Sequence, residues 1–274
     1  MVVFTLQRGG SPLILSIPHA GVALMPGLAE RLTDSGRQLP DTDWWLDRLY
    51  GFAAPDLDAT VLCATHSRYV IDLNRDPSGA SLYPGQATTG LFPATTFDGE
   101  PLYRRGRELA PEETDGRQRG YFDPYHAALA AEIARVRSLH GFALLYDCHS
   151  IRSEVPRLFA GTLPVFNLGT NSGQSCATGL EAALADVLTS AAGFTHAVNG
   201  RFKGGWITRA YGRPGEQVHA VQMELACRAY MSERPPFGYD PALAAAVQPV
   251  LRELLKTMLA WGEAQAMNGA GVAG

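Results

Sequence analysis

The chain has 274 residues, a formal net charge of −4 and a pI near 6.0, with 46% apolar and 18% charged residues. This length fits one large domain or two small ones with a full core, and the composition is that of a globular protein. The sequence has no run of five basic residues, no signal-type N-terminus and no apolar stretch approaching the ~20 residues of a membrane span, so we expect neither a nucleic-acid nor a membrane partner. Its four cysteines form no CxxC pair, which favours a reducing cytoplasm over a disulfide framework.

The first predicted core strand is Pro12–Pro18, an apolar run interrupted only by Ser16. It delivers His19 to its carboxyl end, where Pro18 and Gly21 indicate a tight turn. Such a turn would hold the imidazole of His19 just outside the sheet.

Two acidic residues, Asp41 and Asp43, precede Trp44–Phe52, in which the apolar residues have helical spacing. One of them would serve as the N-cap of this helix. Two acids within three residues are more than a cap requires, so the second is available for another role.

A second strand is predicted at Ala59–Thr65, and Arg68–Arg75 is interpreted as a further, largely buried strand. Two arginines and Asn74 on a buried strand are unfavourable without an anionic partner. The segment therefore predicts an anion-binding role, and internal salt bridges to Asp72 are the structural alternative.

Residues 76–119 are rich in Pro, Gly and Thr and show little periodicity. A connection of this length is usually functional, and we interpret it as a loop excursion that covers the site. Asp123 and Pro124 then have the signature of a helix start, with Asp as N-cap and Pro at the first helical position, and the helix is predicted to continue through Arg137.

The chain is organised around Gly141–Ser150, where an apolar run ends abruptly in Asp147, Cys148, His149 and Ser150. Uninterrupted apolar residues predict a strand buried on both faces of an α/β sheet. Ligands and catalytic groups in such folds gather beyond the carboxyl ends of the strands. His149 is thus placed for chemistry, with a satisfied buried histidine as the alternative.

After a strand at Leu163–Gly169 and a helix at Gly179–Ala192, residues 199–214 combine basic side chains with glycines and aromatic residues. The basic residues of this segment are Arg201, Lys203, Arg209 and Arg213. The composition favours a loop that approaches an anionic small molecule closely, and a solvated basic loop is the alternative.

The late strand His219–Ala226 alternates so that Glu224 lies near its end, either projecting towards the same rim as His149 or serving as a salt-bridged acid. Asp240 and Pro241 repeat the helix-start signature, and an amphipathic helix is predicted to about Glu263. We expect residues 1–266 to form a single catalytic domain and residues 267–274 to be a frayed tail.

The alternation of strands and helices predicts an α/β fold with a mixed, mainly parallel sheet and helices on both faces. Strand ends would then present His19, His149 and Glu224, and a helix start would present Asp43. Two imidazoles and one carboxylate are a common ligand set for a catalytic zinc ion with a fourth position for water. A further carboxylate could move the proton of that water. No HExxH element supports this by spacing alone.

Several motifs together resemble the N-formylglutamate amidohydrolase (deformylase) family of histidine catabolism. They are Ser16–Gly21, Asp41–Trp44, Ser67–Arg75, Asp147–Ser150 and Asn199–Gly205, and the resemblance spans roughly Pro12 to Ala229. That family is similar to aspartoacylases and zinc carboxypeptidases, so the resemblance implies a fold of that kind.

The resemblance implies one zinc ion per chain, or another divalent metal, held by His19, His149 and a carboxylate. In the carboxypeptidases a glutamate follows the first histidine by three residues, and here that position is Val22. The carboxylate must therefore come from elsewhere, and Asp43 is the choice, with Asp41 as the fallback.

The remaining roles also follow from the resemblance. Glu224 takes the place of the general base, and Arg68 corresponds to the arginine that polarises the scissile carbonyl. Asn74 and Arg75 would hold one substrate carboxylate, and the loop with Arg201, Lys203 and Arg209 would hold the other.

The expected activity is hydrolysis of N-formyl-L-glutamate, a dianion, to L-glutamate and formate. Hydrolysis of another N-acyl amino acid by a zinc amidohydrolase, and non-catalytic binding of acidic amino acids, are the alternatives. The sequence indicates no oligomeric state, and a monomer would suffice for this chemistry.

Overall fold

The computed structural model describes residues 2–82 and 84–270, the last three by their backbone alone. The strands are β1 (Phe4–Gln7), β2 (Leu13–Ile17), β3 (Thr60–Ala64), β4 (Ala143–Ile151), β5 (Phe166–Gly169), β6 (His196–Val198) and β7 (Val218–Ala226). The α-helices are α1 (Asp34–Arg37), α2 (Leu46–Leu49), α3 (Ala53–Leu57), α4 (Thr114–Arg117), α5 (Asp123–His140), α6 (Thr178–Ser190), α7 (Trp206–Tyr211) and α8 (Pro241–Ala270). Short 3₁₀-helices cover Pro111–Glu113, Pro214–Glu216 and Cys227–Ala229, and one turn of π-helix, called the π-turn below, covers Gln118–Phe122.

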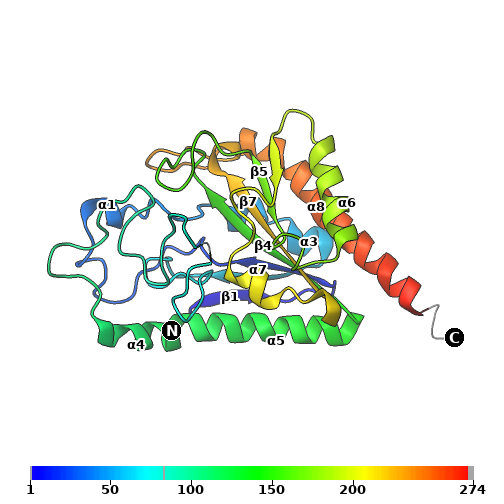
Figure 1. Cartoon of the computed structure of the whole chain (residues 1–274), viewed down its shortest axis with the longest axis horizontal. Coiled ribbons are helices and arrows are strands. Elements are labelled where there is room, and N and C mark those ends of the chain that lie inside the picture. Colours follow the sequence, from blue (N-terminus) through cyan, green and yellow to red (C-terminus); the bar gives the residue numbers. More distant parts are fainter. Residues whose placement is uncertain (1, 83, 271–274) are drawn as a thin grey trace.

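The described strands form one sheet of seven in the order β1-β3-β2-β4-β7-β5-β6. The four central strands, β3, β2, β4 and β7, are mutually parallel. β1 joins β3 in antiparallel fashion, and β5 does the same at β7. The predicted α/β fold with a mixed, mostly parallel sheet is therefore confirmed (Figure 1).

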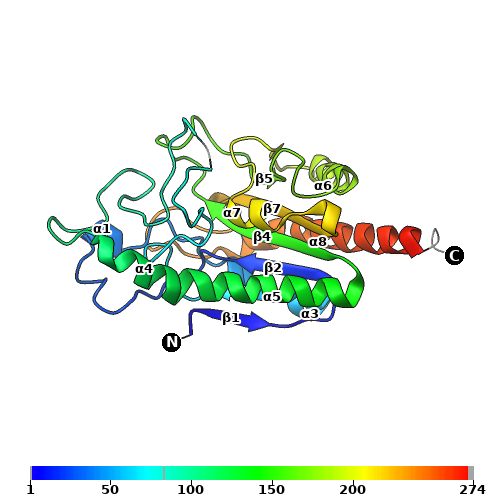
Figure 2. The same cartoon turned by 60° about the horizontal axis from the view of Figure 1, so that its bottom comes forward.

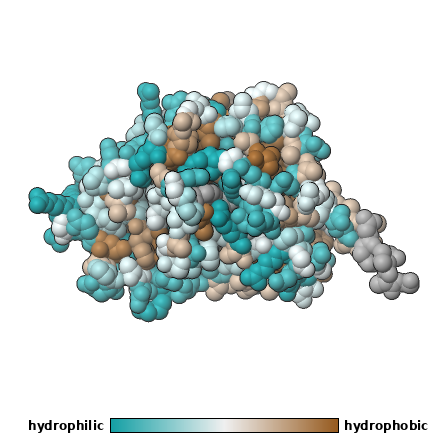
Figure 3. Space-filling view, viewed as in Figure 1, coloured by the Kyte–Doolittle hydropathy of each residue, from teal (hydrophilic) through white to brown (hydrophobic). Residues whose placement is uncertain are grey.

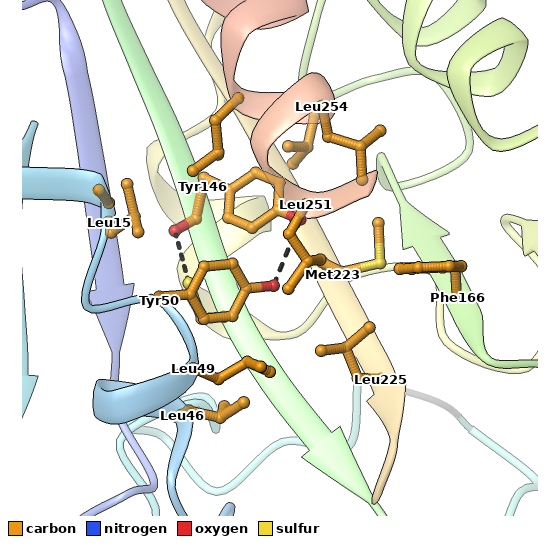
Figure 4. Close-up of a cluster of buried hydrophobic side chains, with 14 of the residues drawn as sticks. Leu15, Leu46, Leu49, Tyr50, Tyr146, Phe166, Met223, Leu225, Leu251 and Leu254 are labelled. Carbon is orange, nitrogen blue, oxygen red and sulfur yellow. Dashed lines mark hydrogen bonds between the residues drawn. The ribbon is translucent and has the colours of Figure 1, made fainter. Parts of the chain in front are cut away.

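Helices cover both faces of the sheet, as predicted. Helix α5 crosses one face, and α6 and α8 lie together on the other (Figure 2). The α8 face buries Leu15 of β2, Tyr146 of β4 and Met223 of β7. The hydroxyl of Tyr146 lies 3.4 Å from that of Tyr50 within this cluster (Figure 4). Because strand side chains alternate between faces, His149 and Glu224 share the opposite face, on which α5 packs.

The carboxyl ends of β2, β4 and β7 point the same way, and the loops gather beyond them (Figure 2). The parallel register pairs His149 of β4 with Glu224 of β7. The first parts of the connections after β2 and β3, residues 18–33 and 65–110, contain no helix and bring His19 and Arg68 to the same rim. This geometry collects side chains that are far apart in the sequence at one end of the sheet.

Two predicted elements near the N-terminus are wrong. Arg68–Arg75 is buried as expected, but it is a series of turns rather than a strand. Trp44–Phe52 is broken: α2 spans only Leu46–Leu49 and begins after Trp45, whose φ of 64° is left-handed. Asp41 and Asp43 therefore do not cap this helix. Burial in a loop and burial in a strand leave similar apolar patterns, so periodicity could not separate them.

Further differences concern helix boundaries. Asp123 is not an N-cap, because the π-turn Gln118–Phe122 runs directly into α5. The basic segment 199–214 contains α7 rather than being loop throughout. The Asp240 signature is confirmed, since its carboxylate accepts hydrogen bonds from the backbone of Ala242 and Leu243.

The C-terminal helix α8 extends to Ala270, beyond the expected end near Glu263 and into the tail that was expected to fray from Met267. Its last turns are rich in Ala, Glu, Gln and Met, which are good helix formers. Residues 271–274 of that tail lie outside the described residues. Among the residues that the structure describes, no helix combines the length and apolarity needed to span a membrane.

Candidate metal centre and active site

Three side chains from distant segments converge at the carboxyl rim of the sheet. His19 follows β2, Asp43 lies in the turn before α2, and His149 is on β4, and all three are buried. One nitrogen or oxygen atom of each lies within 4.8 Å of the others. Oδ2 of Asp43 is 3.1 Å from Nδ1 of His149 and 3.7 Å from Nδ1 of His19. The structure thus brings together the three residues expected to hold a metal.

Each imidazole has a carboxylate on the side away from this cluster. Nε2 of His19 is 2.8 Å from Oδ1 of Asp72, and Nε2 of His149 is 2.9 Å from Oδ2 of Asp147. A proton on Nε2 in both rings leaves both Nδ1 lone pairs directed at Asp43. Carboxylates that orient ligand histidines in this way are characteristic of metal sites.

Buried polar atoms that lack a hydrogen-bond partner at the centre of the cluster indicate whether a metal would fit. Nδ1 of His19 is buried and has no hydrogen-bond partner anywhere in residues 2–82 and 84–270. Two imidazole nitrogens and a carboxylate oxygen that face one another across a few ångströms could hold a metal ion between them. The donor set of two nitrogens and one oxygen is that of catalytic zinc sites, so the residues fit zinc.

The structure places Asp43 rather than Asp41 beside the histidines. Asp43 also accepts a hydrogen bond from the backbone of Ser150, at 3.2 Å. Asp41 turns away: its Oδ2 accepts hydrogen bonds from the hydroxyl of Tyr69 at 2.7 Å and from the backbone of Phe97 at 2.9 Å. Burial raises the pKa of Asp41 to about 6 despite these bonds.

Glu224 lines the same cavity from β7, and its carboxylate is held by a neighbour on its own strand. Nε2 of Gln222 donates to Oε2 of Glu224 at 3.1 Å. The amide of Gln222 is in turn oriented by the backbone N–H of Gly205, which donates to its Oε1 at 2.7 Å. Burial raises the pKa of Glu224 to about 7, partly offset by the positive charges nearby. Such a carboxyl is suited to take up and return a proton near neutral pH.

Arg68 lines the cavity between the metal ligands and the loop excursion. Its Nη2 donates to Oδ2 of Asp72 at 2.7 Å, and its Nη1 lies 3.4 Å from Oδ1 of Asp43. The expected internal salt bridge is therefore present. Burial opposes ionisation of Asp72, but the charges of Arg68 and Arg75 hold its pKa well below the usual value. Nε of Arg68 is buried without a hydrogen-bond partner in the described chain, so it remains able to donate.

Asn74 is buried and forms hydrogen bonds inside the site. Its Oδ1 accepts from the backbone of Ile207 at 2.8 Å, and its Nδ2 lies 2.8 Å from Nε2 of His149, 3.2 Å from Oδ2 of Asp147 and 3.4 Å from Oε1 of Gln222. A Cβ on Gly205 would lie 2.4 to 2.6 Å from this amide, so the backbone can approach Asn74 only with glycine there. Asn74 thus ties the β4 and β7 ends to the glycine loop.

The cavity between these groups has a volume of about 60 Å³ open to the centres of water molecules. Its wall includes His19, His149, Arg68, Glu224, Asn74, Gln222, Arg75, Arg201, Phe97, Ile151, Leu158, Phe202 and the segment Ala87–Thr89. On the face drawn in Figure 3, hydrophilic residues prevail and apolar residues form small separate areas.

One end of the cavity, called the far end below, lies under the 76–119 excursion. Arginines there hold the excursion by its backbone. Arg75 donates from Nε to the carbonyl of Thr89 at 2.8 Å, and Arg201 donates from Nη2 to the carbonyl of Ala87 at 3.0 Å. Arg209 on α7 donates to the carbonyl of Leu82 at 3.0 Å. The excursion therefore lies over the site, with Arg75 and Arg201 facing the cavity.

Two expected substrate-binding residues lie outside the cavity wall. Lys203 is exposed, and Arg209 packs half-buried against Gly204, whose carbonyl it binds at 3.0 Å. Sequence reasoning missed Gln222 and Phe97 as parts of the site. A signal for Gln222 existed, because it precedes Glu224 by two residues on the same face of a strand. Nothing in the sequence around Phe97 distinguishes it from the rest of the excursion.

The fold and the site define a class: an α/β protein with a candidate catalytic metal centre at the carboxyl ends of parallel strands. The sequence profile of the N-formylglutamate amidohydrolase family matches residues 11–231. The chain belongs to this family.

Relatives match over nearly their whole length. An N-formylglutamate deformylase from Pseudomonas aeruginosa is 51% identical over 260 residues, which cover 95% of this chain and 97% of that protein. One from Pseudomonas putida is 49% identical with the same coverage. The crystal structure of an N-formylglutamate amidohydrolase from Ralstonia eutropha JMP134 has a TM-score of 0.78 and 27% identity, covering 98% of this chain and all of that one. The predicted family is confirmed.

Proposed function

We propose that this protein is an enzyme that hydrolyses N-formyl-L-glutamate to L-glutamate and formate, a reaction of histidine degradation in the cytoplasm. The observation that supports the proposal is the convergence of His19, Asp43 and His149 at a cavity that is lined by both histidines and by Glu224. Identity near 50% to two N-formylglutamate deformylases supports the choice of substrate.

One divalent ion, zinc in the first instance, would be held by His19, Asp43 and His149. When bound, zinc supplies Lewis acidity and lowers the pKa of water towards ~7. Asp72 and Asp147 hold the two imidazoles in the orientation and tautomer that this role requires.

The chain's own residues would move the proton. Glu224 takes a proton from the attacking water while the oxygen of that water bonds to the formyl carbon. Glu224 then delivers that proton to the nitrogen as the C–N bond breaks. The proton left on the formic acid passes to the released amine, giving formate and the ammonium form of glutamate. Gln222 keeps the carboxylate of Glu224 in place through both transfers.

Cationic side chains would stabilise charge at two places. Arg68, which lines the cavity wall, would stabilise the oxyanion that develops on the formyl oxygen, where one lost donor typically costs about 10²–10³ in rate. Arg75 and Arg201 at the far end would bind the carboxylates of the substrate.

The test is an assay of formate release from N-formyl-L-glutamate by the purified chain, with metal analysis of the same sample. We expect turnover, close to one zinc per chain, loss of activity on dialysis against a chelator and recovery on adding zinc. Binding of acidic amino acids without turnover in the zinc-loaded chain would contradict the proposal. Activity that survives complete metal removal would contradict the metal role alone.

A further inference from the structure

A second, smaller cavity lies directly behind the wall of the active-site cavity. The side chains of Phe97 and Ile151 line both, so they form the partition between the two. The second cavity has about 10 Å³ open to the centre of a water molecule, which is room for about one water or methyl group. Its other side is closed by Trp44, Met231 and Phe237.

The partition is held firmly. Ile151 is the last residue of β4, two residues beyond His149 on the same face of the strand, and is 5% exposed. Phe97 is equally buried, and its backbone is fixed on both sides: its N–H donates to Asp41 at 2.9 Å, and its carbonyl accepts from Nε of Arg157 at 2.9 Å. Neither side chain can move away without disturbing a strand end or these bonds.

The partition lies at the reacting end of the cavity. The ring of Phe97 has the guanidinium carbon of Arg68 4.9 Å from its centre, and Arg68 contacts the candidate ligand Asp43. The other apolar side chains of the wall, Leu158 and Phe202, pack against the same apolar cluster but lie beside Arg201. The guanidinium of Arg201 lies 5.2 Å from the ring centre of Phe202, and its Nε donates to the carbonyl of Leu158 at 2.9 Å.

This division assigns directions to the substrate. The carbonyl oxygen must face Arg68 and the metal ligands, and the glutamate part must face the arginines at the far end. The third substituent of the reacting carbon is then directed at the remaining wall of the reacting end, whose apolar side chains are Phe97 and Ile151. In a formyl group this substituent is a hydrogen atom.

We propose that Phe97 and Ile151 form the stop that restricts the acyl group to formyl, a specificity role that rests on the proposed function. A methyl in place of the formyl hydrogen would press against a buried, well-fixed wall, and overpacking of this kind is unfavourable. Shortening either side chain would join the two cavities and make room for an acetyl group.

The experiment compares N-acetyl-L-glutamate with N-formyl-L-glutamate in the full-length, zinc-loaded chain. In Ile151→Ala we expect the ratio of kcat/KM for acetyl over formyl to rise at least tenfold, because one methylene in a tight pocket is worth about 10- to 200-fold. Ile151→Val and Phe97→Leu should shift the ratio in the same direction by less. They cover the case in which the alanine variant fails to fold.

Val155→Ala is the matched control, because Val155 belongs to the same apolar cluster as Phe97 and Ile151 but lines neither cavity. Its ratio should equal that of the wild type. An unchanged ratio in all three wall variants, or an equal change in Val155→Ala, would overturn the proposal.

A binding measurement separates this inference from the proposed reaction. Calorimetry on Glu224→Gln, with and without Ile151→Ala, gives Kd for both compounds without turnover. If the acetyl compound binds relatively better when Ile151 is shortened, the stop is supported. This holds even if the wild-type chain releases no formate, a result that would contradict only the proposed reaction. Equal relative binding in both chains overturns the stop and leaves the reaction standing.

Discussion

The two ends of the active-site cavity are built in different ways. At the reacting end, His149 and Glu224 project from adjacent parallel strands, and each polar group is oriented by a second buried group such as Asp147 or Gln222. At the far end, Arg75 and Arg201 come from loops and hold other loops by backbone carbonyls. His149 and Glu224 thus project from the sheet, whereas Arg75 and Arg201 are carried by loops.

The difference has a physical reason. Strand ends in a packed sheet fix side chains to the fraction of an ångström that proton transfer needs. An arginine that reaches across a loop tolerates small displacements, because its planar group donates several hydrogen bonds. Variants at the reacting end should therefore affect kcat or metal binding, and variants at the far end should affect KM.

The largest effect is expected for Glu224→Gln, which keeps the shape but cannot accept a proton. Formate release should fall about 10²- to 10⁴-fold while zinc content stays at the wild-type level. Glu216→Gln, on a side chain that is 57% exposed, is the control and should be fully active. Near-normal turnover in Glu224→Gln would remove it as the general base.

Asp147→Asn tests the support of a ligand at the same end. Loss of the carboxylate against Nε2 of His149 should weaken zinc binding about 10- to 100-fold, measured by competition with a chromogenic chelator. The surface variant Asp186→Asn should bind zinc normally. Equal affinities in the two variants would mean that Asp147 only maintains the fold.

Arg75→Ala tests the far end. Removing a charged donor should raise KM for the dianionic substrate about tenfold or more with a small change in kcat, since charge-assisted hydrogen bonds are worth roughly 1.5–3 kcal/mol. Arg213→Ala, on a side chain 63% exposed, is the matched control. A fall in kcat at constant KM would mean that Arg75 acts at the reacting end, and would contradict the distinction between the two ends of the cavity.

Gln222→Met should lower kcat by roughly tenfold and leave KM nearly unchanged, because one hydrogen bond to the general base is lost. The fluorescence-monitored unfolding midpoint reports any general destabilisation. A lower midpoint with unchanged kcat would show that Gln222 serves only to hold the Gly205 loop.

The smallest effect is expected for Lys203→Ala, since Lys203 is exposed and lies outside the cavity wall. KM should stay within about twofold of the wild type, as for most surface substitutions. A tenfold increase would show that the basic loop contacts the substrate in a way that the cavity does not reveal.

Much of the site was predictable because buried strands have a strong pattern. The apolar runs of β2 and β4 end in polar residues, and parallel strand ends meet at one rim, so His19 and His149 were expected together. The alternation in β7 placed Glu224 on the correct face. Asp41 and Asp43 could not be separated in this way, because side-chain direction in an irregular turn has no period.

The basic segment 199–214 shows what composition could not predict. Composition indicated cations near an anion, yet Arg201 faces the cavity while Lys203 and Arg209 do not. Arg68–Arg75 was buried as expected but formed turns, in which Arg68 contacts Asp43, Asp72 contacts His19 and Asn74 contacts Asp147. Such long-range partners leave no trace in local periodicity.

The sequence by itself determined the class of fold and the two histidines, because hydrophobic periodicity and strand punctuation are local properties of the chain. Only the tertiary structure decided which aspartate joins them, which arginines line the cavity and that Phe97 lies beside Arg68 in its wall. Those outcomes depend on how separate segments pack against each other, and packing is decided by shape and distance in space.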